Sequence, residues 1–370
     1  MLDATWWAQI ALIGHDLHLS STQLAVALAG APAGLLCAVR LVPPLVARGS
    51  SATVLARAIA FSAVALGLIG AAGSLVTLTA ALVLFGLGNG TIDITVNVQA
   101  VALERILGRP VMSRLHAMWS LGTLLGGLGG SAAIALGATP GLWLTAVAVV
   151  MLALGSLRRG ALLGPEADAA APRLAVPGPA GPRMLSQPGL IVLGAIAFSG
   201  LFAEGAVSNW AGVLLHQVRH ASFGVAALGA AAFGTGMLCG RLTGDRVLAR
   251  AGRRRTLGWA GSAAAVMMAV VALVPSGGAA LAGLVVLGGL LATVVPTAFS
   301  LTAAVPGPPP AWTISRLTTI GYAGSFAGPV VVGAVAGASR LTVALLIPAL
   351  LLLAIAPAAR MTRGRLAGSG

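Results

Sequence analysis

Residues Phe85–Gly127 read FGLGNGTIDITVNVQAVALERILGRPVMSRLHAMWSLGTLLGG, and they hold a large share of the polar side chains of an otherwise apolar chain. Asn89, Asp93 and Asn97 recur every four residues, so on a helix they form a polar stripe along one face. A carboxyl group inside a membrane helix is costly and usually faces a water-filled path or a partner. The stripe therefore indicates solute transport or proton relay. A polar stripe can also serve only to hold helices together, and this alternative stays open.

The composition predicts a membrane protein. The chain is 58% hydrophobic and 8% charged, whereas soluble domains contain about 25% charged residues. Apolar stretches of about 20 residues, the length of a bilayer-spanning helix, are separated by short segments rich in Gly, Pro and Arg. We count twelve stretches, of which the first, from Met1 to about residue 13, is too short to span. The sequence thus predicts an all-α membrane protein built from two six-helix bundles.

The predicted organisation is an N-terminal bundle over 1–159, a linker rich in Pro, Ala and Gly over 160–187, and a C-terminal bundle over 188–370. All 22 basic residues are Arg. In this topology only Arg219 and Arg340 lie outside, and the positive-inside rule then places the linker and the C-terminus in the cytoplasm. The formal charge of +14 is explained by this rule, so we expect no nucleic-acid partner. Abundant Arg, Ala and Gly suggest a bacterial source and its inner membrane.

An internal repeat relates the two halves. A shift of 202 residues aligns them without gaps and pairs Arg48 with Arg250 and Arg114 with Arg316. Matches in one register indicate duplicated halves of parallel topology. The same shift places the counterpart of Pro188, where the seventh stretch begins, before Met1. We therefore expect a helix stub at residues 2–7, with roughly 15 residues of the first helix absent.

The repeat also helps to distinguish residues that maintain the fold from residues that form a functional site. Residues of the first kind should recur in both halves, whereas those of a single site need not. Asp93 pairs with Val295, and Glu204 pairs with Leu2. We predict that Asp93 and Glu204 exchange the coupling proton, since a carboxyl group removed from water can trade a proton as a cavity changes sides. Glu204 could instead be a packing acid bonded to Ser208 or Asn209.

The sequence resembles the major facilitator superfamily on these features and on one motif. The run from Gly240 to Arg246, GRLTGDR, followed by Arg253 to Arg255, is similar to the signature loop between the second and third helices of each half. In such a loop, Asp and Arg can pair across inner helix ends and hold a gate closed. The gating residues predicted here are Glu104, Arg105, Arg241, Asp245 and Arg246. The alternative for the individual Arg residues is simple positive-inside topology.

Within the superfamily, residues 87–122 resemble the fucose and proton symporter branch, which has an acid four residues before Asn in helix four and a polar residue in helix five. The resemblance implies that Asp93 titrates. Asp93 and His116 stand where the sugar symporters have Glu and Gln. Aromatic walls and hydroxyl groups would complete a solute site. The predicted solute-binding residues are Asn89, Asn97, His116, Trp119, Trp210, Thr318 and Tyr322.

We therefore predict a monomeric secondary transporter that moves a small polar, sugar-like solute by alternating access, coupled to protons. No metal-ligand spacing or phosphate-binding loop indicates an enzyme, a catalytic residue, a metal or a cofactor. Proton-antiport efflux of drugs or metabolites is the alternative within transport. A non-transporting membrane sensor or scaffold is the alternative from another class.

Overall fold

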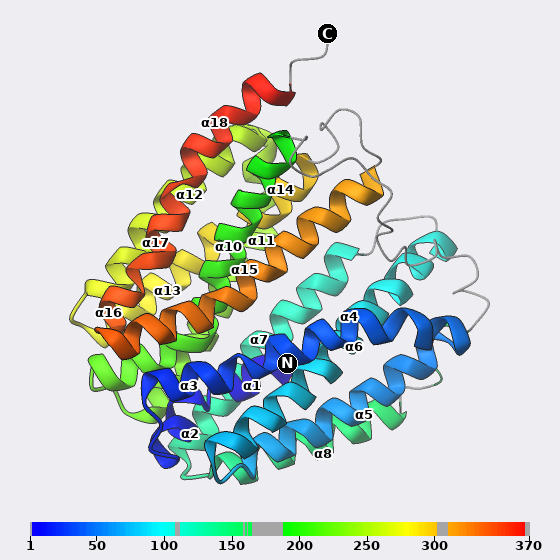
Figure 1. The fold of residues 1–370 in the computed structure, drawn as a ribbon, viewed down its shortest axis with the longest axis vertical. Coiled ribbons are helices and arrows are strands. Elements are labelled where there is room, and N and C mark those ends of the chain that lie inside the picture. The colour runs from blue at the N-terminus through cyan, green and yellow to red at the C-terminus, as the bar shows by residue number, and fades with distance from the viewer. Residues whose placement is uncertain are drawn as a thin grey trace. The chain divides into compact units, whose positions relative to one another are not determined.

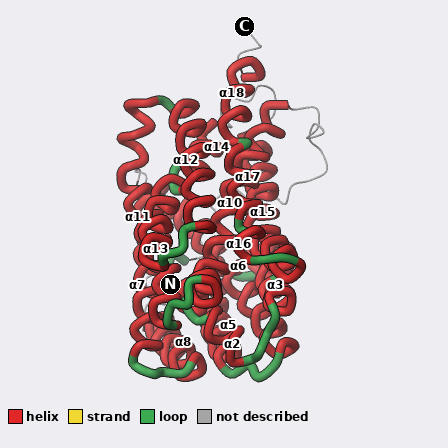
Figure 2. Tube along the Cα trace, turned by 90° about the vertical axis from the view of Figure 1, so that its left-hand side faces the viewer, coloured by secondary structure: helices red, strands yellow, loops and turns green. Residues whose placement is uncertain are grey.

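The computed structural model describes residues 2–107, 112–157, 160, 162–164, 188–301 and 310–366. Contacts divide the chain into two compact units, Met1–Val176 (unit 1) and Pro177–Gly370 (unit 2). Within the described residues the regular structure is helical and contains no strand (Figure 2). This confirms the predicted all-α class. The exact bounds predicted for the bundles and the linker stay a prediction, because residues 161 and 165–187 lie outside the described part.

Unit 1 contains the N-terminal helices (Figure 1). They are α1 (Leu2–Trp7), α2 (Ile10–Asp16), α3 (Ser21–Leu28), α4 (Gly30–Arg48), α5 (Ser51–Gly70), α6 (Leu75–Leu107), α7 (Met112–Ala135) and α8 (Pro140–Leu157). Unit 2 contains α10 (Pro188–Val213), the π-helix η3 (Leu214–Val218), α11 (Phe223–Ala251), α12 (Arg253–Leu273), α13 (Gly277–Leu291), α14 (Val294–Leu301), α15 (Pro310–Ala338), α16 (Leu341–Ala344), α17 (Leu346–Leu353) and α18 (Ile355–Leu366).

Eleven segments of the described chain are long and apolar enough to cross a membrane. The first of them begins at Ser21, since α1 and α2 have only 6 and 7 residues. Eleven long segments preceded by a short one agree with the twelve stretches counted in the sequence.

Several predicted spans are divided into shorter helices, and proline explains where. Proline has no N–H to bond the carbonyl four residues earlier, and its ring crowds that carbonyl. Pro32, Pro348 and Pro357 stand four residues after the last residues of α3, α16 and α17, and Pro296 stands four residues after the C-cap of α13. The membrane-length segments Ser21–Arg48, Gly277–Leu301 and Leu341–Met361 therefore each contain more than one helix.

Glycine brings helix backbones together at the same positions in both units. In unit 1, a Cβ atom added at Gly34 of α4 would overlap the Val83 carbonyl of α6. In unit 2, a Cβ atom at Gly236 of α11 would overlap the Val285 carbonyl of α13. Both pairs obey the 202-residue shift. Small residues allow such close approach between membrane helices, so the duplicated sequence has kept its duplicated packing.

A second glycine seam joins α10 to α15, which run side by side in unit 2 (Figure 1). A Cβ atom at Gly324 or Gly328 of α15 would overlap the carbonyl oxygens of Phe198 and Phe202 in α10. The seam holds together the two helices that carry several of the predicted site residues of unit 2.

Replacing Gly236 by Ala tests this packing. Its methyl group would meet the backbone of α13, which cannot move aside as a flexible side chain can, and we expect a loss of roughly 1–3 kcal/mol of stability. The measurement is thermal unfolding of the detergent-solubilised protein. Gly258→Ala is the matched control, because its Cβ would come no closer than 3.9 Å to a neighbour. Equal melting temperatures for the two variants would contradict the packing account.

Candidate functional site

The polar stripe of α6 is present as predicted, and its side chains are half-buried. The Asn97 Nδ2 donates to the Asp93 carbonyl oxygen at 2.8 Å and to Asp93 Oδ1 at 3.3 Å. Thr91 and Thr95 donate to carbonyl oxygens four residues earlier, each at 2.7 Å. Such bonds along one helix satisfy polar groups that apolar surroundings would otherwise leave unpaired.

The third member of the stripe reaches another helix. The Asn89 Nδ2 donates to both carboxyl oxygens of Asp3 in α1, at 3.1 and 3.2 Å. Asp3 is buried, with 9% of its surface exposed, and Asp93 lies within electrostatic reach of it. Unit 1 therefore brings together two carboxyl groups and the carboxamide that binds one of them.

Asp3 was not among the predicted site residues. Residues 1–13 are too short an apolar stretch to span a bilayer, and their length alone predicts no partner for Asp3. The sequence nonetheless contains a signal, because the polar residues Asp3, Thr5 and Gln9 interrupt an apolar segment. In the structure all three are buried. Gln9 fixes the other end of the segment by donating from Nε2 to the Gly130 carbonyl oxygen of α7 at 3.3 Å.

In unit 2, Glu204 lies on α10 among apolar side chains and is half-buried. It forms no hydrogen bond or ion pair with the described residues, and the guanidinium charge of Arg241 in α11 acts on it. The alternative partner Asn209 instead donates to the Gly205 carbonyl oxygen at 2.8 Å. The structure therefore brings a predicted coupling acid within electrostatic reach of a predicted gating arginine.

The predicted aromatic residues differ in exposure. Trp119 of α7 is 39% exposed, whereas Trp210 of α10 is 0% exposed. The Trp210 Nε1 donates to the Pro329 carbonyl oxygen of α15 at 2.9 Å. Tyr322 of α15 stacks on Phe326 with ring centroids 6.2 Å apart. Trp210 thus packs inside unit 2 and joins the two helices of the glycine seam.

The other predicted residues are placed less completely. Thr318 lies one turn before Tyr322 on α15 and is half-buried, as is Glu104 near the end of α6. Arg246 of α11 is exposed. The side chains of Arg105, His116 and Asp245 lie outside the described part of the structure. Among the described residues, no group of three or more His, Cys, Asp or Glu side chains could hold a metal ion.

Apolar helices of membrane-spanning length, arranged as two repeated units, define a polytopic membrane protein. Similarity to known proteins identifies its family. The chain is 34% identical over 290 residues to an uncharacterised MFS-type transporter of Yersinia pestis, covering 77% of this chain and 72% of that protein. It is 32% identical over 349 residues to an uncharacterised transporter of Sinorhizobium fredii, covering 92% of this chain and 89% of that protein. The chain belongs to the major facilitator superfamily of transporters. No family model matches it.

Solved structures share the fold. The nucleoside transporter NupG superposes with a TM-score of 0.77 over 98% of this chain and 96% of NupG, at 14% identity. A D-xylose-proton symporter superposes with a TM-score of 0.70 at 14% identity, covering 97% of both chains. The Escherichia coli fucose:proton symporter FucP gives 0.58 at 16% identity, covering 98% of this chain and 97% of that one. At these identities the likeness concerns the fold.

The contact of Trp210 generates a prediction. Trp210→Phe keeps an aromatic ring but leaves the Pro329 carbonyl without its donor, which should cost about 1 kcal/mol of stability. Trp259→Phe is the control, because Trp259 is 64% exposed. Thermal unfolding of the two purified variants measures the difference. A Trp210→Phe variant as stable as the control would show that the indole bond does not hold α10 to α15.

Proposed function

We propose that this chain is a secondary active transporter that moves a small polar, sugar-like solute across the bacterial inner membrane by alternating access, coupled to protons. The observation that carries the proposal is the group formed by Asp3, Asn89 and Asp93. When two carboxyl groups are close enough to interact and one of them is buried, states in which at least one of them is protonated are favoured. Proton uptake and release can thus be linked to a change of conformation.

The carboxamide of Asn89 gives this group a way to respond to conformation. Asn89 lies on α6 and Asp3 on α1, so relative movement of the two helices would change the bonds to the carboxyl group. A carboxylate that loses donors in an apolar site takes up a proton more readily. In this proposal the proton enters or leaves at Asp3 and Asp93 as α1 and α6 shift.

Glu204 and Arg241 are the proposed counterpart in unit 2. Arg241 would stabilise the carboxylate of Glu204 in one conformation and move away from it in another. Proton coupling and gating would then be linked within unit 2. The solute would be bound by the polar and aromatic side chains predicted from the sequence. Its proposed contacts are Asn89, Asn97, His116, Trp119, Thr318 and Tyr322. We assign Trp210 to helix packing because its ring is buried and its N–H is already bonded.

The remaining parts of the proposal follow from the charge distribution and from the relatives. The arginine-rich helix ends support an orientation with the linker and the C-terminus in the cytoplasm. The fold shared with the nucleoside, fucose and xylose transporters supports polar solutes with several hydroxyl groups as the first to be tested. We propose that the monomer is the transporting unit.

Proteoliposomes with an internal pH dye test the function. A panel of pentoses, hexoses and nucleosides should contain a solute that causes proton flux through the wild type in the direction of its own movement. In Asp3→Asn and Asp93→Asn, gradient-driven accumulation should fall to the level of empty liposomes, while solute exchange without a gradient persists. Asp16→Asn is the matched control, because its side chain is 51% exposed and pairs with His15.

Proton movement opposite to the solute would favour antiport efflux over symport. Solute movement without proton flux would remove proton coupling from the proposal. Coupled transport that is unchanged in Asp93→Asn and in Glu204→Gln would show that neither acid carries the proton. No movement of any solute by a folded protein would favour the sensor or scaffold.

A further inference from the structure

Serine caps recur at equivalent helix starts in the two units. Ser20 and Ser222 accept a hydrogen bond from the backbone N–H three residues later, at 3.3 and 3.4 Å. Ser74 and Ser276 do the same at 3.2 and 3.3 Å. Each pair is related by the 202-residue shift. These caps satisfy N–H groups that a helix leaves unbonded at its start.

The equivalent starts of α5 and α12 depart from this rule. Ser50 caps α5 by accepting from the Thr53 N–H at 3.2 Å. Its counterpart before α12 is Gly252, which has φ +78° and no side chain with which to cap. The start of α12 therefore keeps more of its N–H groups available to an external acceptor.

The space beside the start of α5 is filled by the chain itself. Gln99 of α6 donates from Nε2 to the Leu163 carbonyl oxygen at 3.0 Å and accepts from the Leu163 N–H at 2.9 Å. The same Nε2 donates to Ser51 Oγ at 2.6 Å. Gln99 is buried, so a segment of backbone occupies a built site between α5 and α6.

The equivalent place in unit 2 is an open cavity at the protein surface, with a volume of about 350 Å³. The 202-residue shift converts Ser51 to Arg253 and Gln99 to Leu301, and both of these residues line the cavity. Its other lining residues are Ala251, Gly252, Arg254 and Arg255. A site that binds a neutral peptide in unit 1 is thus open and strongly basic in unit 2.

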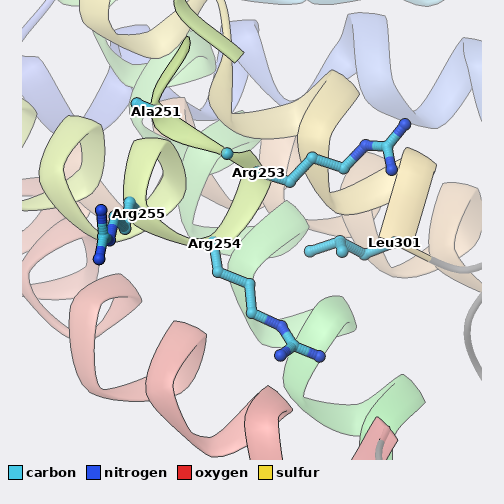
Figure 3. A pocket seen from close by; sticks show the side chains of 6 residues that line it. Ala251, Arg253, Arg254, Arg255 and Leu301 are labelled. Carbon is cyan, nitrogen blue, oxygen red and sulfur yellow. The ribbon is translucent and has the colours of Figure 1, made fainter. Parts of the chain in front are cut away.

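The cavity is suited to an anion. Arg253 and Arg254 extend on the side where Leu301 lies, whereas Arg255 points away (Figure 3). Arg253 forms no hydrogen bond or ion pair with the described residues. Arginine binds phosphate oxygens through two parallel N–H bonds, and an uncapped helix start adds backbone donors and a favourable dipole.

We propose that this cavity binds the phosphate group of an anionic phospholipid. In the orientation proposed above, it lies at the inner membrane surface, where anionic lipids gather and basic cavities at helix ends bind their headgroups. Charge complementarity favours this occupant over the basic C-terminal tail, which carries Arg363 and Arg365. The inference concerns lipid binding and holds whether or not transport is proton-coupled.

Native mass spectrometry of the delipidated full chain tests the site by titration with phosphatidylglycerol. Each surface arginine strengthens binding to an anionic headgroup by roughly fivefold, so Arg253→Gln/Arg254→Gln should bind about 25-fold more weakly. Arg57→Gln/Arg360→Gln is the matched control, with the same charge change at two exposed arginines. Leu301→Trp should also weaken binding, because the larger ring fills the cavity without changing the charge.

Glycerol phosphate completes the experiment as a soluble competitor for the same site. Binding of phosphatidylglycerol that glycerol phosphate does not displace identifies a lipid site, whereas displacement at equal concentration shows that a free phosphate is also accepted by the same chemistry. Equal losses in the arginine variant and its control would overturn the proposal. It would also be overturned if Leu301→Trp bound phosphatidylglycerol as tightly as the wild type, because the lipid would then lie outside the cavity.

Discussion

Contact between helix backbones at glycine is the constraint on which this structure depends. Lipid tails are as apolar as leucine side chains, so membrane helices gain little by burying apolar surface against each other and rely on close packing. Gly34 and Gly236 supply that packing at equivalent places in the two units, and Gly324 supplies it between α10 and α15. Since these contacts involve backbone atoms, they persist through duplication while nearby side chains diverge. Asp93 in one unit and Val295 in the other illustrate this freedom.

The fold could be predicted from the sequence because its causes are local. Apolar stretches of bilayer length predict spanning helices, and the 202-residue shift predicted that the halves repeat. Helix breaks were missed at Pro296 and Pro348, although the rule that places a break near the fourth residue before proline could have found them. That rule also has exceptions, since α4 and α15 continue through Pro43 and Pro329.

The candidate site could be predicted only in part, because tertiary contacts decide the rest. The bond between Asp93 and Asn97 lies within one helix and follows from their spacing. The bond between Asn89 and Asp3 joins residues 86 positions apart, and no periodicity indicates it. Trp210 was predicted to bind solute from its residue type alone. Its burial follows from the seam between α10 and α15, which single-sequence reasoning did not resolve.

The central claim is that Asp3 and Asp93 exchange a proton. Infrared difference spectroscopy of the reconstituted protein during a pH titration tests it most directly, because protonated carboxyl groups absorb separately from carboxylates. The account predicts that the wild type shows a carboxyl band that appears on acidification. Asp3→Asn and Asp93→Asn should each remove or shift that band, and Asp16→Asn should leave it in place. Identical carboxyl bands in the wild type and in both buried-site variants would contradict the account.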